Sequence, residues 1–429
     1  MEGETEAFDL KIEGELPQAL RGVFVRNGPN PYNGTTGHWF LGDGMLHGVR
    51  LEDGKATWYR ARYIDTPVLG VEPSDGLEIP DIREHQANTS VVHHGGRVLC
   101  LAEIGLPFEV SANDLGTIGV HDFGGKLASP MTAHPKIDSA SGEMFFFGYG
   151  FLPSGLDYHV VDSSGQITLS QKITVPEPTM MHDFQLTATR AVFMDFPLVF
   201  DMDEALAGEA MPFVWKPSLG SRIGVMPRSG GEVAWFEIEL GYVFHTVNAY
   251  DDPNDGAVVL EAIRYASMWE NGAGDFNTVG HLHRWRIDVE NGNVKEEALD
   301  DRGIEFPCIA PSKQGRPYRY SFGLTIDSDA PSTPAFEPNA IIKYDREKGN
   351  KSIHRMPGPR RLGETTFVAD PNGSAEDDGW LLAYDYDYDN DSSALVVFDA
   401  RDMSAPHVAR VLLPRRVPYG FHGTWVADS

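Results

Sequence analysis

Histidines in short aromatic, apolar or glycine-containing stretches are the residues of this sequence that could hold a transition metal. Four of them are His134 in TAHPK, His182 in MHDF, His245 in FHTVN and His422 in FHGTW. The neutral imidazole ring is a frequent ligand of iron, zinc and copper. Dozens of residues or more separate these positions, so a common site needs a fold that brings four distant segments together.

Other histidines offer alternatives to this set. The chain has fifteen histidines, and most are expected to have structural roles. His281 and His283 in GHLHRW stand two residues apart, which places both on one face of a strand and makes them a potential two-ligand unit. Their flanking arginines favour an exposed strand instead. The tripeptide HDF occurs at both His121 and His182, and the residue types alone do not choose between them.

Strands must position these histidines, because convincing helical periodicity is rare in this chain. Only residues 16–22 and 201–208 are candidates for short helices. Runs of β-branched and aromatic residues bounded by Gly, Pro, Asp or Asn predict strands along the sequence. These runs cover residues 97–105, 142–150, 158–162, 190–201, 256–266 and 393–400.

Many of the predicted strands end in an aspartate and a glycine turn, which is typical of an antiparallel meander. A β-propeller fits such a meander at this length, although a pair of sandwiches fits it as well. No linker or shift in composition divides the chain, so we expect a single domain over residues 1–429. The inner strands of a propeller face a central channel, where distant histidines could meet. A histidine as close to the C-terminus as His422 then has a purpose if the last strand lines that channel.

Composition restricts the partners and the cellular location. The 429 residues carry a formal net charge of −28, which repels phosphate backbones and argues against nucleic-acid binding. Cys100 and Cys308 have no neighbouring cysteine or histidine ligands, which fits a reducing compartment. With no apolar leader or apolar window of membrane-spanning length, we expect a cytoplasmic protein. The acidic runs at 376–379 and 384–391 lack the spacing of a calcium loop and are expected to be solvated loops.

From about residue 10 to the end, the sequence resembles the carotenoid cleavage oxygenase family, which also includes lignostilbene- and phenylpropenoid-cleaving enzymes. The matching motifs are GVFVRNGPNP, HWFLGDGMLHGVRL, TAHPKIDSASGEMFFFGY, MMHDFQLT, IEFPCI, GETTFV, AEDDGWLL and FHGTW. The resemblance implies an all-β fold, a seven-bladed β-propeller with a cap of loops and short helices over the iron-binding face. It also implies one non-haem Fe(2+) ion held by His134, His182, His245 and His422. His121 is not among the implied ligands.

Further site residues follow from the same resemblance. It implies that Glu103, Glu305 and Glu364 accept hydrogen bonds from the outer nitrogens of three ligand rings, and that Thr89 lies near the iron as a catalytic residue. An apolar substrate would need an apolar tunnel. The aromatic residues that we expect to line it are Phe40, Phe108, Phe151 and Trp425.

The reaction implied by the resemblance is cleavage of a conjugated C=C bond by O₂ to give two carbonyl products. Apocarotenoids are the favoured substrates, because the stilbene branch has a lysine directly before the first glutamate where this chain has Ala102. Stilbenoid or phenylpropenoid cleavage remains an alternative, as does non-oxidative isomerisation or hydrolysis of a retinoid. A metal-free binding scaffold is a further hypothesis. Residues 197–200 or 211–215 could form an apolar patch for peripheral membrane contact, or could belong to the core.

Overall fold

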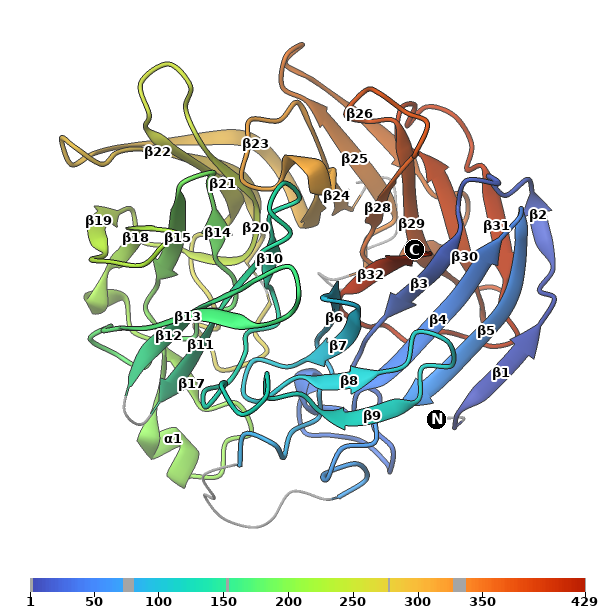
Figure 1. The fold of residues 1–429 in the computed structure, drawn as a ribbon, viewed down its shortest axis with the longest axis horizontal. Coiled ribbons are helices and arrows are strands. Elements are labelled where there is room, and N and C mark those ends of the chain that lie inside the picture. Colours follow the sequence, from blue (N-terminus) through green and yellow to red (C-terminus); the bar gives the residue numbers. More distant parts are fainter. Residues whose placement is uncertain (1–2, 72–80, 152–153, 277, 327–336, 429) are drawn as a thin grey trace.

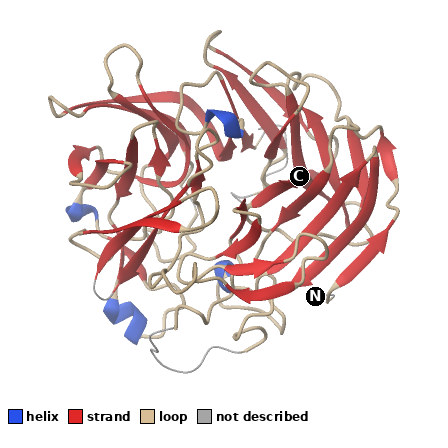
Figure 2. Ribbon diagram, in the orientation of Figure 1, coloured by secondary structure: helices blue, strands red, loops and turns tan. Residues whose placement is uncertain are grey.

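The computed structural model describes residues 3–71, 81–151, 154–276, 278–326 and 337–428. In this part of the chain the structure is nearly all strand, arranged as blades around a central axis (Figures 1 and 2). One α-helix and three 3-10 helices are present among the described residues: α1 (Met202–Leu206), η1 (Trp39–Leu41), η2 (Pro217–Leu219) and η3 (Pro311–Lys313).

The described strands form seven hydrogen-bonded sheets, and six of these sheets make up the seven blades. One sheet is only a two-stranded hairpin, β16 (Leu198–Phe200) with β17 (Phe213–Trp215), and is not a blade. Another sheet has seven strands and contains two blades, which share the long strand β23 (Asn293–Cys308). The first part of β23 pairs with the strand before it, and residues from Ile304 onward pair with the strand after it. The predicted propeller is therefore confirmed.

Each blade runs from an inner strand at the axis to an outer strand at the rim. In that order, blade 1 contains β32 (Gly423–Ala427), β3 (Gly22–Arg26), β4 (Met45–Glu52), β5 (Lys55–Tyr63) and β1 (Thr5–Phe8). Blade 2 contains β6 (Ser90–His94), β7 (Arg97–Leu101), β8 (Phe108–Val110) and β9 (Thr117–Val120). Blade 3 contains β10 (Lys136–Ile137), β11 (Met144–Phe151), β12 (Ser154–Val161) and β13 (Ile167–Ile173). Blade 4 contains β14 (Gln185–Leu186), β15 (Arg190–Asp195), β18 (Ser221–Pro227) and β19 (Ala234–Ile238).

Blades 5 to 7 complete the ring. Blade 5 contains β20 (Tyr242–Asp251), β21 (Val258–Tyr265), β22 (His281–Asp288) and the first part of β23. Blade 6 contains the second part of β23, β24 (Tyr320–Thr325), β25 (Ala340–Asp345) and β26 (Asn350–Arg355). Blade 7 contains β28 (Thr366–Ala369) and β27 (Arg360–Leu362) on the same edge of β29 (Gly379–Asp387), then β30 (Ser392–Asp399), β31 (Ala409–Leu412) and β2 (Ile12–Gly14).

Both ends of the chain close the ring. The C-terminal strand β32 pairs antiparallel with β3 in blade 1, from Gly22 opposite Ala427 to Arg26 opposite Gly423. The N-terminal strand β2 pairs with β31 in blade 7. The closing strands cover the edge of β3 in blade 1 and the edge of β31 in blade 7, which would otherwise be open to pairing with another chain.

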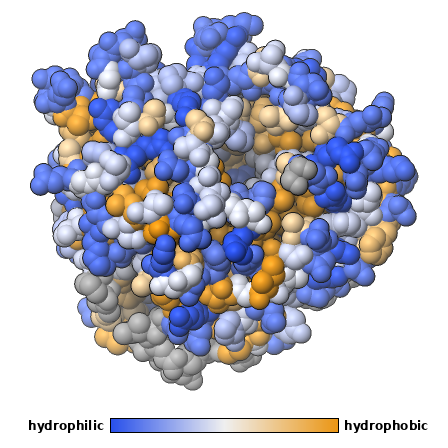
Figure 3. Space-filling model, in the orientation of Figure 1, coloured by the Kyte–Doolittle hydropathy of each residue, from blue (hydrophilic) through white to orange (hydrophobic). Residues whose placement is uncertain are grey.

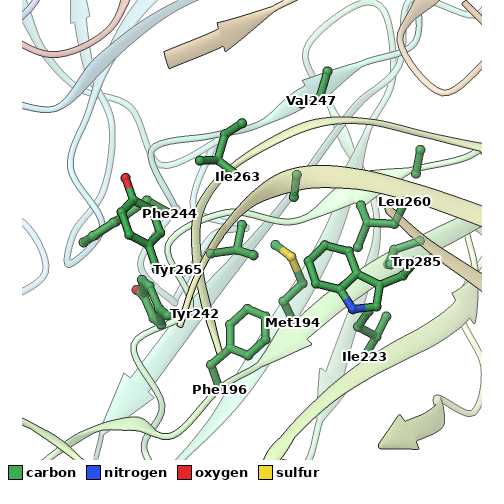
Figure 4. Packing of buried hydrophobic residues seen from close by; sticks show 14 of the residues in the cluster. Met194, Phe196, Ile223, Tyr242, Phe244, Val247, Leu260, Ile263, Tyr265 and Trp285 are labelled. Atoms are coloured by element: carbon green, nitrogen blue, oxygen red, sulfur yellow. The ribbon is translucent and has the colours of Figure 1, made fainter. Parts of the chain in front are cut away.

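Apolar side chains fill the spaces between neighbouring blades. Figure 4 shows one such cluster, where Met194 and Ile223 of blade 4 meet Leu260 and Trp285 of blade 5. Each of the four is at most 2% exposed. Burial of one such side chain contributes about 1.5–3 kcal/mol, so the clusters between blades stabilise the ring. The visible rim is mostly hydrophilic (Figure 3), as the net charge indicates.

The predicted helix at 201–208 is confirmed as α1. Asp201 caps it, because its side chain accepts hydrogen bonds from the backbone N–H groups of Asp203 and Glu204. Gly208 follows the helix with φ +87° and ends it. The helix predicted at 16–22 is wrong, since those residues form a turn and the first residue of β3.

Only the second half of the acidic run 384–391 is the solvated loop that its composition suggests. Its first half, 384–387, belongs to β29, where Asp385 and Asp387 are buried, whereas 388–391 form an exposed turn. Asp385 pairs with Arg410 at 3.1 Å and Asp387 with Arg360 at 3.0 Å. The aspartates are tolerated inside because each carboxylate has a cationic partner.

The two candidate membrane patches form the hairpin β16–β17. Leu198 and Val199 are buried, so this half of the hairpin belongs to the core, and Phe213 and Trp215 are half-buried. Within the described ranges, the structure has no helix whose length and apolar character would allow it to span a bilayer.

Candidate metal centre

The four candidate ligands come from four different blades. Each lies in, or shortly before, the innermost strand of its blade, at the centre of the ring in Figure 1. The strands are β10 for His134, β14 for His182, β20 for His245 and β32 for His422. The radial arrangement of the blades therefore brings together residues that are far apart in the sequence.

The other three blades contribute the remaining polar residues around the axis. Thr89 directly precedes β6 of blade 2, Glu305 lies in β23 of blade 6, and Glu364 precedes β28 of blade 7. The backbone of Thr89 supports a ligand, since its carbonyl accepts the N–H of His422 at 3.1 Å. Its hydroxyl donates to Asn88 Oδ1 at 3.1 Å, and a catalytic role for this side chain stays a prediction.

The ligand nitrogens of the four histidines all lie within 4.8 Å of one another. The Nε2 atoms of His134 and His182 are 3.0 Å apart, and those of His182 and His245 are 3.3 Å apart. The rings of His134 and His422 have their centroids 4.3 Å apart and stand nearly perpendicular to each other. Within the described part of the chain, this is the one group of three or more potential ligand residues close enough to share a metal ion.

Glutamates lie behind three of the rings. His245 Nδ1 is 2.6 Å from Glu305 Oε2, and His422 Nδ1 is 3.0 Å from Glu364 Oε1. Glu103, just after β7, contacts His182 Nδ1. A carboxylate at Nδ1 accepts the proton of that nitrogen, fixes the orientation of the ring and leaves the lone pair on Nε2.

This arrangement fits a divalent transition metal. Three Nε2 lone pairs and the ring of His134 point at one small volume, and such lone pairs repel one another unless a cation lies between them. Burial, reinforced by the neighbouring His422, His182 and His245, lowers the pKa of His134 well below its usual range, so this ring is neutral and able to ligate. An all-imidazole set suits iron, copper, nickel or zinc rather than magnesium or calcium.

Each of the three glutamates also accepts a hydrogen bond from a group other than the histidine ring. The Tyr149 hydroxyl donates to Glu103, and the Tyr265 hydroxyl donates to Glu305 Oε1 at 2.8 Å. The backbone N–H of Gly423 donates to Glu364 Oε2 at 3.1 Å. Sequence reasoning missed both tyrosines, because a tyrosine in a strand looks the same whether its hydroxyl faces water or a buried carboxylate.

Comparison with known proteins settles the family. The family model described as retinal pigment epithelial membrane protein matches residues 1–427. A carotenoid cleavage oxygenase from Mycobacterium tuberculosis is 35% identical over 487 residues, covering 99% of this chain and 95% of that protein. The chain belongs to the carotenoid cleavage oxygenase family. With its four-histidine site, this family member is an oxidoreductase.

Solved structures of two relatives agree with the fold. A variant of the Synechocystis apocarotenoid oxygenase, a seven-bladed propeller, matches with a TM-score of 0.90 and 29% identity, covering 100% of this chain and 97% of that one. A lignostilbene dioxygenase from Pseudomonas brassicacearum matches with a TM-score of 0.90 and 29% identity, covering 99% and 96%. Equal similarity to both means that the fold does not distinguish their substrates.

Aromatic rings in this oxygenase form a continuous series from the surface to the ligands. Trp39, 37% exposed, packs on Phe421 with 4.8 Å between ring centroids, and Phe40 of η1 packs on Phe421 at 5.4 Å. Phe421 precedes His422 in the chain. Next to the ligands, the ring of Phe306 lies 5.3 Å from that of His245. The rings of η1 therefore pack on Phe421, the residue directly before the ligand His422.

The other three aromatic residues expected to line a tunnel lie in three different blades. Phe151 lies at the end of β11 and packs on Phe200 and Phe213 of the hairpin, with Tyr149 close by. Phe108 is 2% exposed among apolar residues of blades 1 and 2. Trp425 of β32 packs against the core between blades 1 and 7. Phe108 is thus buried in the core and Trp425 is partly buried against it, and contact of Phe40, Phe108, Phe151 or Trp425 with a substrate stays a prediction.

The competing histidines lie away from the centre. His121 follows β9 of blade 2, where its Nδ1 is 3.9 Å from a Glu109 oxygen. His281 and His283 share one face of β22, the third strand of blade 5, and line a surface pocket of about 430 Å³ with Arg264. The strand periodicity of that pair was correctly predicted, but blade 5 contributes its ligand from β20 instead.

Replacing Glu305 by glutamine should leave the propeller folded and weaken metal affinity or activity about 10–100-fold. The neutral amide cannot replace the charged carboxylate that accepts the hydrogen bond from His245 Nδ1. Titration of the metal-free protein with Fe(II) or Co(II) measures this effect. Glu297→Gln is the matched control, since Glu297 lies on the same strand and its side chain is 50% exposed. Equal affinities of the two variants would show that Glu305 does not support the ligand.

Proposed function

We propose that this oxygenase uses Fe(II) at the four-histidine site to cleave a C=C bond of a conjugated, apolar substrate with O₂, giving two carbonyl products. The convergence of four imidazoles at the axis carries the proposal. Bound there, non-haem iron would supply the O₂ chemistry that amino-acid side chains lack. Four neutral ligands leave coordination positions of octahedral iron for other molecules.

The chain's own residues orient the ligands and exclude water. Glu103, Glu305 and Glu364 contact three of the rings at their outer nitrogens, which keeps the inner lone pairs directed at the axis. Aromatic rings such as Phe306 and Phe40 provide an apolar surrounding in which a hydrocarbon chain is favoured over water.

An apocarotenoid is the substrate class that we favour. Ala102, 5% exposed, stands directly before Glu103, where the stilbene branch has a lysine, so a phenol would find no cation at this position. Lys136, near the site, is already paired with Asp183 at 2.8 Å. The names of several relatives refer to carotenoids or apocarotenoids, which supports this choice.

The test is anaerobic reconstitution with Fe(II), followed by measurement of O₂ uptake and products with an apocarotenal and with a hydroxystilbene. We expect one O₂ consumed for each apocarotenal cleaved and both oxygen-bearing fragments recovered as carbonyl compounds. Metal-free protein is the control. Cleavage of the hydroxystilbene alone would move the assignment to the stilbenoid alternative. Turnover of a retinoid ester with no O₂ uptake would overturn the oxygenase proposal.

A further inference from the structure

Asp183, the residue after the ligand His182, is a buried carboxylate that receives hydrogen bonds from three neighbouring blades. It is 2% exposed. Oδ1 accepts from Lys136 Nζ at 2.8 Å and from the N–H of Phe184 at 2.7 Å. Oδ2 accepts from the backbone N–H of Thr246 at 2.9 Å and from its hydroxyl at 2.7 Å. Both oxygens are therefore fully engaged, as a buried charge requires.

The partners of Asp183 are sequence neighbours of the other ligands. Lys136 begins β10, two residues after His134, and Thr246 follows His245 directly in β20. One carboxylate thus links the inner strands of blades 3, 4 and 5, which carry three of the four histidines. Among these links, Lys136 is the one that ties the blade of His134 to the others.

The fourth ligand is held in another way. His422 donates its N–H to the Thr89 carbonyl at 3.1 Å, and its own carbonyl accepts the N–H of Asn27 at 3.0 Å. These backbone bonds belong to the closure of the ring by the C-terminal segment. The ligand set therefore has two supports: the chain closure for His422, and Asp183 for the other three.

We propose that Asp183 is a positioning residue that sets the spacing of His134, His182 and His245 by tying their strands together. Metal sites tolerate errors of only about 0.5 Å in ligand position, so a shared buried anchor next to each ligand affects affinity directly. The proposal rests on metal binding by the four histidines. It does not require a particular substrate.

The experiment compares full-length variants prepared without metal and titrated with Co(II) against a competing chelator. Asp183→Asn and Lys136→Met remove the charge pair. Thr246→Val removes one hydroxyl donor and keeps the shape of the side chain, while Thr246→Ser keeps the hydroxyl. Asp195→Asn is the control: Asp195 is another buried aspartate of blade 4, paired with Arg222 at 2.8 Å away from the ligands.

We expect Co(II) affinity to fall about 10–100-fold in Thr246→Val and in both charge-pair variants, with a shift of the visible Co(II) bands that reports altered ligand geometry. Thr246→Ser should restore both affinity and spectrum. Asp195→Asn should lower the melting temperature and leave the Co(II) affinity and the Co(II) spectrum unchanged. If Asp183→Asn does not fold, the Thr246 pair decides the question.

Two results would be negative in different ways. Wild-type affinity and spectrum in Thr246→Val, with a lower melting temperature, would overturn the positioning role and reduce Asp183 to a structural contact. Failure of the wild-type protein to bind either Co(II) or Fe(II) would overturn the metal site itself, and with it the proposed function.

Discussion

His182→Ala should abolish metal binding and oxygenase activity while the propeller remains folded. The variant loses one of four imidazoles and leaves Glu103 without the ring that it contacts. We expect metal content to fall from about one ion per chain to near zero, because an incomplete ligand set binds weakly. The melting temperature should match that of metal-free wild-type protein, since bound metal stabilises a protein by about 2.7 kcal/mol at a hundred times its Kd.

The control for this substitution is His121→Ala. His121 opens the other HDF tripeptide of the chain and lies after β9 in blade 2, so it shares the local sequence without sharing the site. Metal analysis and O₂ uptake should show this variant to be like the wild type. Full iron content in His182→Ala, or a metal-deficient His121→Ala, would show that the wrong HDF histidine has been assigned.

Truncation after Gly420 should destabilise the whole propeller as well as remove a ligand. It deletes β32, which pairs with β3 over five residues and includes the buried Val426. Hydrogen bonds at about 0.5–1.5 kcal/mol each and a buried valine at about 1.5–3 kcal/mol together approach a typical total stability of about 5–15 kcal/mol. We expect aggregation or unfolding at ambient temperature, detected by thermal circular dichroism and size-exclusion chromatography.

Full-length His422→Ala separates the two consequences of that truncation. It removes the ligand but keeps β32, so it should elute like the wild type, melt cooperatively and bind no metal. The edge of β3 is exposed only in the truncated chain, where its unpaired backbone groups can pair with another chain and cause aggregation. A truncated protein that melts like His422→Ala would mean that β32 contributes little to closing the ring.

The positions of strands and helices show how much of the fold the sequence predicts. Each of the six predicted strand runs overlaps an observed strand, and together they overlap β7, β11, β12, β15, β16, β21 and β30. The acidic start and glycine end of 201–208 predicted α1. The run 190–201 was expected as one strand, but Pro197 separates β15 from β16. Asp385 and Asp387 escaped prediction because their partners Arg410 and Arg360 come from other strands of the blade.

At the metal centre, too, the sequence predicted some residues and missed others. The residue types limited the ligands to a few of fifteen histidines, and the family resemblance selected four of them together with three glutamates. The hydroxyls of Tyr149 and Tyr265 on those glutamates and the bridge from Asp183 to Lys136 and Thr246 had no signal in the sequence.

By itself, the sequence determined the kind of molecule: a chain of strands and tight turns, with imidazoles in segments able to line a channel. Local residue patterns specify such features, because strand propensity and turn chemistry act over a few positions. Only the tertiary structure decided which side chains meet at the axis. The closure of seven blades by β32 and β2 sets those distances, and they depend on packing between segments hundreds of residues apart.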